Sequence, residues 1–399
     1  MASDHVLPTA PDSFSHYTRL LCESWLRRHF ARRRIGCTGA NRKDFREGVE
    51  FYRGSVQWRR EFVHPESTLL KEQSLPGSVP REMVRLPYLQ VIDLSRNYLN
   101  GTIPPEWGTM EQLVNISLLG NRITGPIPGE LANISTLTDL VLEYNQLSGN
   151  IPLQFGNFSS IKRILLTSNN LTGELSATLA KLTTLKEFRI GDNNFSGSIP
   201  NFIENWTSLE KLLIQGSGLS GPIPSGIASM TKLSDLRISD LNGNDSTFPP
   251  LNNTKNLKTL ILRSCNIIGQ IPLFVGAMTT LKVLDLSFNK LSGPIPENFS
   301  GLSNTDFIYL TGNSLTGPLP AWMLKAKESI DLSYNNLTKH IQIVHRVICK
   351  ITFTFLGIIA GFFSNFHILV TLHHFCQELV QKLKGQYNSG GLRGNYGSE

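Results

Sequence analysis

Apolar residues recur with a fixed period along most of this chain. The repeating unit is LxxLxLxxNxLxGxIP, and ten successive units begin 24 residues apart, at Leu89, Leu113, Leu137, Ile161, Leu185, Leu209, Leu233, Leu257, Leu281 and Thr305. A constant period of this size predicts a solenoid, in which each unit buries its apolar face against its neighbours. A partial unit at Leu75–Pro80 and a truncated unit from Lys327 extend the predicted solenoid over residues 67–338, about eleven repeats.

The first half of each unit alternates apolar and other residues, which predicts a short β-strand. Its apolar residues, such as Leu140 and Leu142, are expected to point inward, and successive strands to stack in parallel about 4.8 Å apart. The second half carries Gly and then Ile-Pro, as at Ile127-Pro128. Gly permits a turn and Pro fixes an extended backbone. We therefore expect strands on a concave face, with turns and short helical pieces rather than full helices on the convex face.

An Asn follows the strand in most units, at Asn97, Asn121, Asn145, Asn169, Asn193, Asn289, Asn313 and Asn335. A buried Asn needs partners, so we expect its amide to bind backbone groups of adjacent turns, at about 1 kcal/mol per bond. Ser217, Leu241 and Cys265 interrupt this column, and the Ile-Pro signal shifts to Phe248–Pro250. The pattern predicts local irregularity between Ser217 and Cys265, with Cys265 as a small buried structural residue.

The two flanks differ from the repeats in charge. Residues 1–66 hold 12 Lys/Arg and 8 Asp/Glu, residues 67–338 hold 20 and 21, and residues 339–399 hold 6 and 2. The neutral middle argues against nucleic-acid binding there. No apolar run follows Met1, so no secretory signal is predicted, and residues 1–66 are expected to be a basic, disordered segment. The five Cys are scattered and predict neither a disulfide framework nor a zinc site.

Beyond the repeats, residues 339–350 are a predicted linker and residues 373–399 a polar tail, expected to be disordered. Between them, residues 351–372 carry no Lys, Arg, Asp or Glu. As a helix, this apolar segment would cross a hydrocarbon core of about 30 Å, and Gly357 and Gly361 form a GxxxG pair. Two hypotheses stay open here: a transmembrane helix, or translated non-coding sequence that packs poorly.

The phrases LKEQSLPGSVPREMVRLPYLQVIDLSRNYLNGTIPPEWG (70–108) and LRSCNIIGQIP (262–272) resemble one group of plant leucine-rich-repeat receptor-like Ser/Thr kinases, which also carry a malectin-like domain. The resemblance covers about residues 69–338. It implies a leucine-rich-repeat solenoid (mixed α/β), a location at the plasma membrane, and a binding role in cell-surface signalling. The flanks depart from the group's pattern. Two alternatives therefore stay open: a truncated, non-functional receptor fragment, and an intracellular leucine-rich-repeat scaffold.

The sequence of these 399 residues contains no glycine-rich loop followed by VAIK, no HRD with a downstream Asn, and no DFG. Those motifs position ATP, magnesium and the catalytic base of a kinase. No HExxH spacing or nucleophile elbow occurs either. We expect a non-catalytic protein with no metal and no cofactor.

Outward strand positions are the candidate binding residues. The third position of successive units alternates in charge, at Asp139, Arg163, Glu187, Lys211 and Asp235. This row indicates either a polar ligand site or, as we favour, a self-neutralising ladder that keeps the face soluble.

The fifth position interleaves aliphatic residues with Arg. This row indicates either a partner site on the concave face for a peptide, glycan or co-receptor protein, or scattered surface aliphatic residues of the ordinary kind. The residues are Val141, Leu165, Arg189, Leu213, Arg237 and Ile261, with Tyr144 beside them. Phe288 and Tyr334 are weaker candidates of the same kind as Tyr144.

Asn-x-Ser/Thr sequons lie at Asn100, Asn115, Asn133, Asn157, Asn170, Asn194, Asn205, Asn244, Asn252, Asn298 and Asn336. They predict a glycosylated extracellular surface. The alternative is that the repeat phrases NxLTG and LxNxSxL generate sequons without use. Asn115 lies on a predicted strand, where a glycan would obstruct the concave face.

Overall fold

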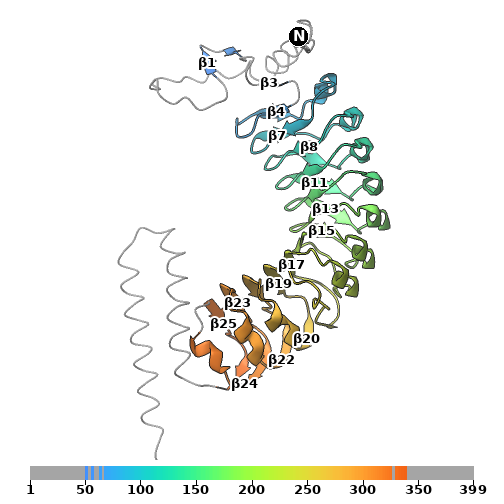
Figure 1. The fold of residues 1–399 in the computed structure, drawn as a ribbon. Coiled ribbons are helices and arrows are strands. Elements are labelled where there is room, and N and C mark those ends of the chain that lie inside the picture. Colours follow the sequence, from blue (N-terminus) through green and yellow to red (C-terminus); the bar gives the residue numbers. More distant parts are fainter. Residues whose placement is uncertain (1–49, 53–54, 58–62, 65–66, 326–328, 339–399) are drawn as a thin grey trace, which may run out of the picture. The chain divides into compact units, whose positions relative to one another are not determined.

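The computed structural model describes residues 50–52, 55–57, 63–64, 67–325 and 329–338. The chain divides into two compact units, Met1–Ile267 and Ile268–Glu399. Both consist of repeated turns with strands on one side and short helices on the other, as Figure 1 shows. The leucine-rich-repeat solenoid predicted from the period is therefore confirmed.

A parallel sheet forms one side of the first unit. Its strands are β4 (Ser67–Leu69), β6 (Val91–Asp93), β8 (Asn115–Ser117), β10 (Asp139–Val141), β12 (Arg163–Leu165), β14 (Glu187–Arg189), β16 (Lys211–Gln215), β17 (Asp235–Ser239) and β19 (Thr259–Arg263). From β6 onward each residue pairs with the residue 24 positions later, as Leu140 does with Ile164. Inward residues such as Leu140 and Leu142 are fully buried. The 24-residue period thus places equivalent positions of successive repeats side by side.

Three further short strands lie in the N-terminal segment. β3 (Val63–His64) pairs antiparallel with β4, and β1 (Glu50–Tyr52) pairs antiparallel with β2 (Ser55–Gln57). The sequence predicts no regular structure there. The remainder of that segment lies outside the described residues.

The 3-10 helices of the first unit lie opposite the strands of the parallel sheet (Figure 1), and a second set of short strands forms separate small sheets. The helices are η2 (Arg81–Arg85), η3 (Pro105–Thr109), η4 (Gly129–Asn133), η5 (Leu153–Asn157), η6 (Ala177–Lys181), η7 (Asn201–Asn205) and η8 (Ser225–Ser229). Most follow the Pro of Ile-Pro, which fixes the extended backbone before the helix begins. The strands are β5 (Pro76–Ser78), β7 (Tyr98–Asn100), β9 (Thr124–Gly125), β11 (Gln146–Gly149), β13 (Asn170–Gly173), β15 (Asn194–Phe195) and β18 (Ser246–Thr247). The short helices were predicted from the sequence and are confirmed. The second set of strands was not predicted.

The second unit repeats the same plan. β21 (Val283–Asp285), β23 (Phe307–Tyr309) and β25 (Ser329–Asp331) form a parallel sheet, and β20 (Ile267–Gln270), β22 (Lys290–Pro294), β24 (Ser314–Gly317) and β26 (Asn336–Leu337) form the second set. Its 3-10 helices are η9 (Leu273–Ala277), η10 (Glu297–Gly301) and η11 (Ala321–Lys325).

The Asn column joins each turn to the preceding one. Asn169 Oδ1 accepts from the backbone N–H of Leu147 at 3.0 Å, and its Nδ2 donates to the carbonyls of Leu142 and Leu166, each at 3.0 Å. Asn97, Asn121, Asn145 and Asn193 make the same set of bonds in their repeats. The predicted role of these amides is confirmed.

The predicted irregularity between Ser217 and Cys265 is also confirmed. β16, β17 and β19 each extend over five residues, whereas neighbouring strands with an Asn have three. Ser217 Oγ accepts from the N–H of Leu219 at 3.3 Å. In regular repeats an Asn accepts from the N–H 22 residues earlier, so an Asn in place of Leu241 would bind this same group. Cys265 is buried and its thiol donates to the carbonyl of Ile238, 27 residues earlier, at 3.4 Å. In other repeats the Asn amide donates to the backbone carbonyls that follow the strand. Where no Asn is present, the backbone hydrogen bonds between neighbouring strands continue for two more residues.

Some predictions fall on residues that the structure does not describe. They are most of the N-terminal segment predicted to be disordered, the predicted linker at 339–350, the predicted membrane segment at 351–372 and the predicted tail at 373–399. Within the described ranges, no helix has the length and apolar character that crossing a membrane requires.

Candidate ligand-binding surface

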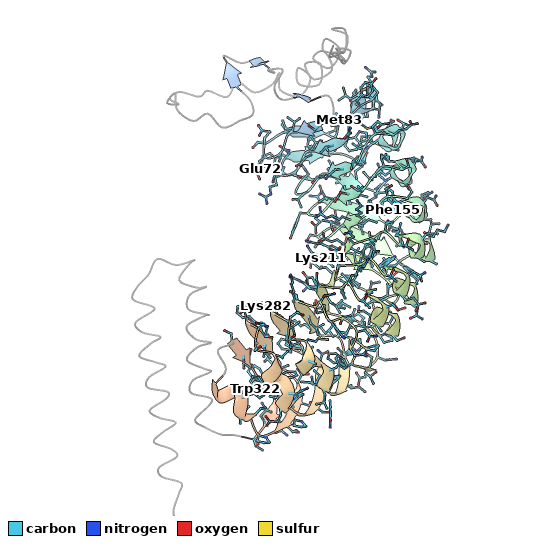
Figure 2. All side chains as sticks on the ribbon, viewed as in Figure 1. Glu72, Met83, Phe155, Lys211, Lys282 and Trp322 are labelled. Carbon is cyan, nitrogen blue, oxygen red and sulfur yellow. The ribbon has the colours of Figure 1, made fainter. Side chains whose placement is uncertain are left out.

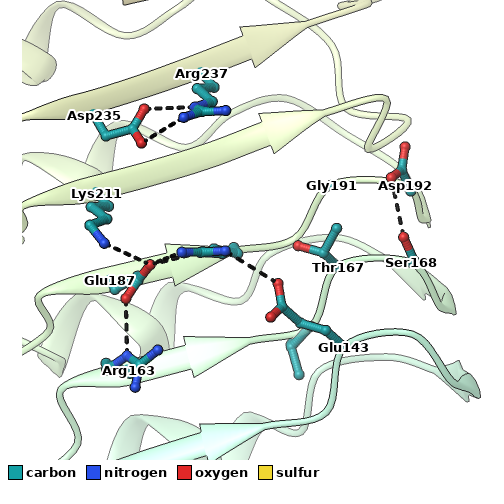
Figure 3. Close-up of polar contacts among 12 residues, drawn as sticks. Glu143, Arg163, Thr167, Ser168, Glu187, Gly191, Asp192, Lys211, Asp235 and Arg237 are labelled. Carbon is teal, nitrogen blue, oxygen red and sulfur yellow. Dashed lines mark hydrogen bonds and ion pairs between the residues drawn. The ribbon is translucent and has the colours of Figure 1, made fainter. Parts of the chain in front are cut away.

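Charged side chains cross the strand face of the first unit in register (Figure 3). Arg163 lies between two carboxylates, with its Nη1 3.1 Å from Asp139 Oδ1 and its Nε 3.0 Å from Glu187 Oε2. Lys211 Nζ lies 3.6 Å from Glu187 Oε1 and projects from the strand side of the unit (Figure 2). Asp235 pairs with Arg237 of its own strand instead, at 2.8 Å. The alternating row therefore neutralises itself over four strands, as the favoured interpretation predicted.

Glu187 is the centre of this network. Its side chain is 8% exposed, and it pairs with Arg163, Arg189 and Lys211. Burial alone would raise the pKa of Glu187, but the hydrogen bonds and charges of Arg189, Arg163 and Lys211 outweigh it and lower the pKa. Burial likewise opposes the charge of Arg163, yet Glu187 and Asp139 raise its pKa. Both shifts favour the charged forms of Glu187 and Arg163.

Glu143 belongs to the same network, and the sequence reasoning missed it. It is buried, and its Oε1 lies 3.8 Å from Arg189 Nη1, so Arg189 bridges Glu143 and Glu187. Glu143 occupies the seventh position of its repeat, where Ser95 and Thr167 stand in other repeats. Other repeats carry Leu119, Gly191, Gln215 and Arg263 at that position, so no pattern in the sequence singled out Glu143.

The fifth-position row is less exposed than predicted. Leu165 was expected to be an exposed aliphatic residue, but it is 2% exposed, so this expectation is wrong. It lies in register between Val141 and Arg189, whose side chains flank it. Burial of an outward residue depends on its neighbours in other repeats, which the pattern of one repeat does not contain.

The other predicted members of the row lie in register and are partly accessible. Val141, Leu213 and Ile261 are half-buried, as are Arg189 and Arg237. Both Arg side chains turn back onto a carboxylate of their own strand, Glu187 and Asp235 respectively. The accessible surface therefore consists of aliphatic residues beside guanidinium groups that are already oriented.

Tyr144, Phe288 and Tyr334 are exposed and share one backbone conformation. Each precedes the Asn of its repeat and has a φ of 55° or 56°. This left-handed conformation is uncommon for residues other than Gly. Their exposed fractions are 59%, 47% and 85%.

The sequon residues differ in exposure. Ten of the eleven Asn residues are exposed, and Asn115 on β8 is half-buried. Its Oδ1 is buried without a hydrogen-bond partner in the described part of the chain. Among the described residues, no group of three or more His, Cys, Asp or Glu could hold a metal ion.

Parallel strands in 24-residue register, an Asn column and 3-10 turns define a leucine-rich-repeat solenoid. Family models of the leucine-rich repeat match residues 255–315, 88–110, 136–158 and 184–206.

The relatives narrow the class further. A probable leucine-rich repeat receptor-like serine/threonine-protein kinase of Arabidopsis thaliana is 68% identical over 276 residues, which are 69% of this chain and 27% of that protein. The chain thus spans about a quarter of that relative's length and is similar to its leucine-rich repeats.

Solved structures of plant receptors show the same fold. The receptor kinase HAESA of Arabidopsis, in complex with the peptide hormone IDA and the co-receptor SERK1, is 34% identical with a TM-score of 0.63, over 68% of this chain and 46% of that one. The plant peptide hormone receptor RGFR1, in complex with RGF2, is 29% identical with a TM-score of 0.63, over 66% and 42%. The chain is therefore similar to the ectodomains of plant peptide-hormone receptors.

Proposed function

We propose that these repeats bind a peptide ligand as the ectodomain of a plant receptor-like kinase, acting in signalling at the plasma membrane. The observation that carries this proposal is the fifth-position row of the first unit. There, accessible Val141, Leu213 and Ile261 alternate with Arg189 and Arg237 on a rigid sheet. Aliphatic contacts supply affinity, and guanidinium groups recognise carbonyl or carboxylate groups of a peptide.

The charge network supports this assignment by making the surface rigid. In the free protein, Glu187 and Asp235 already hold Arg189 and Arg237 in place. Ligand binding therefore loses little conformational entropy from these side chains. The receptors HAESA and RGFR1 were solved in complex with peptide hormones, which supports a peptide rather than a glycan. Membrane anchoring through residues 351–372 is part of the same proposal, as is binding of a co-receptor.

The test uses the full chain and a panel of synthetic plant peptide hormones that includes IDA and RGF2. Binding is measured by isothermal titration calorimetry for the wild type and for L213D/I261D. Leu153 lies on η5, away from the strands, and is 62% exposed, so L153D is the matched control. We expect the double variant to lose binding and the control to keep it. Equal binding by all three proteins would overturn the proposal.

A further inference from the structure

The strand face of the second unit differs in chemistry from that of the first. On β21, β23 and β25, Tyr309 pairs in register with Asp285 on one side and Asp331 on the other. Phe307 precedes Tyr309 on the same face, between Val283 and Ser329. The fifth-position row here is therefore Asp–Tyr–Asp, without an Arg or a Lys.

Aromatic rings dominate this surface. Phe307 and Tyr309 stack with ring centroids 6.2 Å apart and planes inclined by 6°. Phe307 is 38% exposed. Phe288 and Tyr334 follow the C-terminal ends of β21 and β25. Gly312 occupies the equivalent position after β23 and leaves room for the Phe288 ring, because a Cβ on Gly312 would lie 2.7 Å from Phe288 Cδ1. We call Phe288, Phe307, Tyr309 and Tyr334, together with Asp285 and Asp331, the aromatic–acidic face.

The two carboxylates of this face have no cationic partner among the described residues. Asp285 Oδ1 accepts from the N–H of Ser287 at 2.9 Å, and Asp331 Oδ1 accepts from the N–H of Ser333 at 3.0 Å. The hydroxyls of Ser287 and Ser333 donate to the same Oδ1 atoms, and neither Oδ2 makes a hydrogen bond or ion pair with another described residue. In the first unit, by contrast, Asp139, Glu187 and Asp235 all have an Arg or Lys partner. Burial and both carboxylates also raise the pKa of the Tyr309 hydroxyl. The second unit thus presents uncompensated negative charge beside π faces.

We propose that the aromatic–acidic face binds an extended, proline-containing peptide segment with two basic residues three positions apart. Asp285 and Asp331 are separated by two strand spacings, about 10 Å. In a polyproline-II helix, residues i and i+3 lie on the same side, about 9 Å apart. Two Arg or Lys side chains at this spacing meet the two carboxylates. The residues between them pack on Tyr309 and Phe307, as Pro does in aromatic grooves, and each cation also lies near a ring face.

This site is separate from the row Val141–Ile261 and does not require that row to bind anything. A neutral ligand, such as an oligosaccharide, could stack on the rings but would leave both carboxylates without a counter-charge. The charge complementarity therefore favours the basic peptide.

The experiment measures binding of short peptides to the full chain by NMR line broadening or calorimetry. The probe is Ac-Arg-Pro-Pro-Arg-NH2. One control peptide, Ac-Arg-Arg-Pro-Pro-NH2, has the same composition in a different spacing, and a second has citrulline in place of both Arg. We expect the probe to bind at least ten-fold more tightly than either control peptide. Equal affinity for the citrulline peptide would overturn the proposal. Tighter binding of a neutral oligosaccharide, cellohexaose, than of the probe peptide would overturn it too.

The protein variants separate charge from packing. D285A/D331A removes both carboxylates, whereas Asn at either position would create an Asn-Leu-Ser sequon. Asp93 is the matched control, because it makes the same bond to Ser95 N–H but lies in register with Leu69 and Ser117 rather than with an aromatic residue. We expect D285A/D331A and Y309L to weaken probe binding at least ten-fold, with D93A unchanged. Unchanged binding in D285A/D331A, with a thermal midpoint like that of D93A, would refute the proposal while leaving peptide binding by the first unit intact.

Discussion

Asn169 joins its own turn to the preceding one by accepting from Leu147 N–H and donating to Leu142 carbonyl, 22 and 27 residues earlier in the chain. N169A would leave these buried groups without partners. We expect it to lower the free energy of unfolding by about 2–3 kcal/mol. Urea denaturation followed by circular dichroism measures this. A loss no larger than that of an exposed substitution such as T172A would show that water replaces the amide.

The lowered pKa of Glu187 should make the free energy of unfolding depend on pH in the acid range. Its folded-state pKa is lowered by Arg189, Arg163 and Lys211. Because the pKa is lower in the folded state, the stabilisation is present above the unfolded pKa, about 4.3, and is lost as pH falls through the folded pKa. At pH 7, E187Q should cost about 1–3 kcal/mol, since it weakens charged hydrogen bonds.

The difference between wild type and E187Q should therefore narrow below about pH 4. The measurement is the free energy of unfolding of both proteins between pH 7 and pH 3. A difference that stays constant across this range would place the stabilisation elsewhere than in the ionised carboxylate.

Leu165 and Leu213 occupy the same repeat position and should respond differently to the same substitution. Leu165 is 2% exposed, so L165D places a charge in a dry environment and should destabilise the protein by about 3 kcal/mol or more. Leu213 is half-buried, and L213D should cost about 1 kcal/mol or less. Thermal unfolding of both variants compares them directly. Similar melting of the two would mean that the face opens at Leu165 in solution.

Asn115 should be the sequon least used in folded protein. A glycan on this half-buried strand residue would have to fit between Val91 and Asp139 of the adjacent strands. The ten exposed sequons have no such restriction. Peptide mapping by mass spectrometry, after expression in plant cells behind a secretory leader, gives the occupancy of each site. Full occupancy at Asn115 with unchanged melting would contradict this expectation.

The sequence predicted those features that depend on a repeat and its immediate copies. The 24-residue period gave the strand register, and the Asn column gave the bonds between turns, because both involve equivalent positions in neighbouring repeats. The interruption at Ser217, Leu241 and Cys265 was predicted for the same reason. The short strands such as β9 were not, because two residues beside a Gly turn are too few for an alternation to be visible.

The surface was harder to predict, because each residue's accessibility depends on side chains from three adjacent repeats. Leu165 is covered by that context, and Glu143 enters the charge network through Arg189, two strands away. Phe307 and Tyr309 lie in the third- and fifth-position rows that suggested the first-unit site. The charges alternate only from Asp139 to Asp235, so Phe307 and Tyr309 were not predicted as site residues.

The three consecutive repeats without an Asn amide have a consequence for how the molecule opens. In an array of repeats, local stability is close to a sum of nearest-neighbour contributions. Between Ser217 and Cys265, a hydroxyl and a thiol provide only part of the bonding that an amide provides elsewhere. Backbone amides of this stretch should therefore exchange with solvent deuterium before those around Asn121–Asn193, through sub-global opening rather than complete unfolding. Slower exchange here than around Asn121–Asn193 would show that the longer backbone ladder of β16, β17 and β19 outweighs the missing amides.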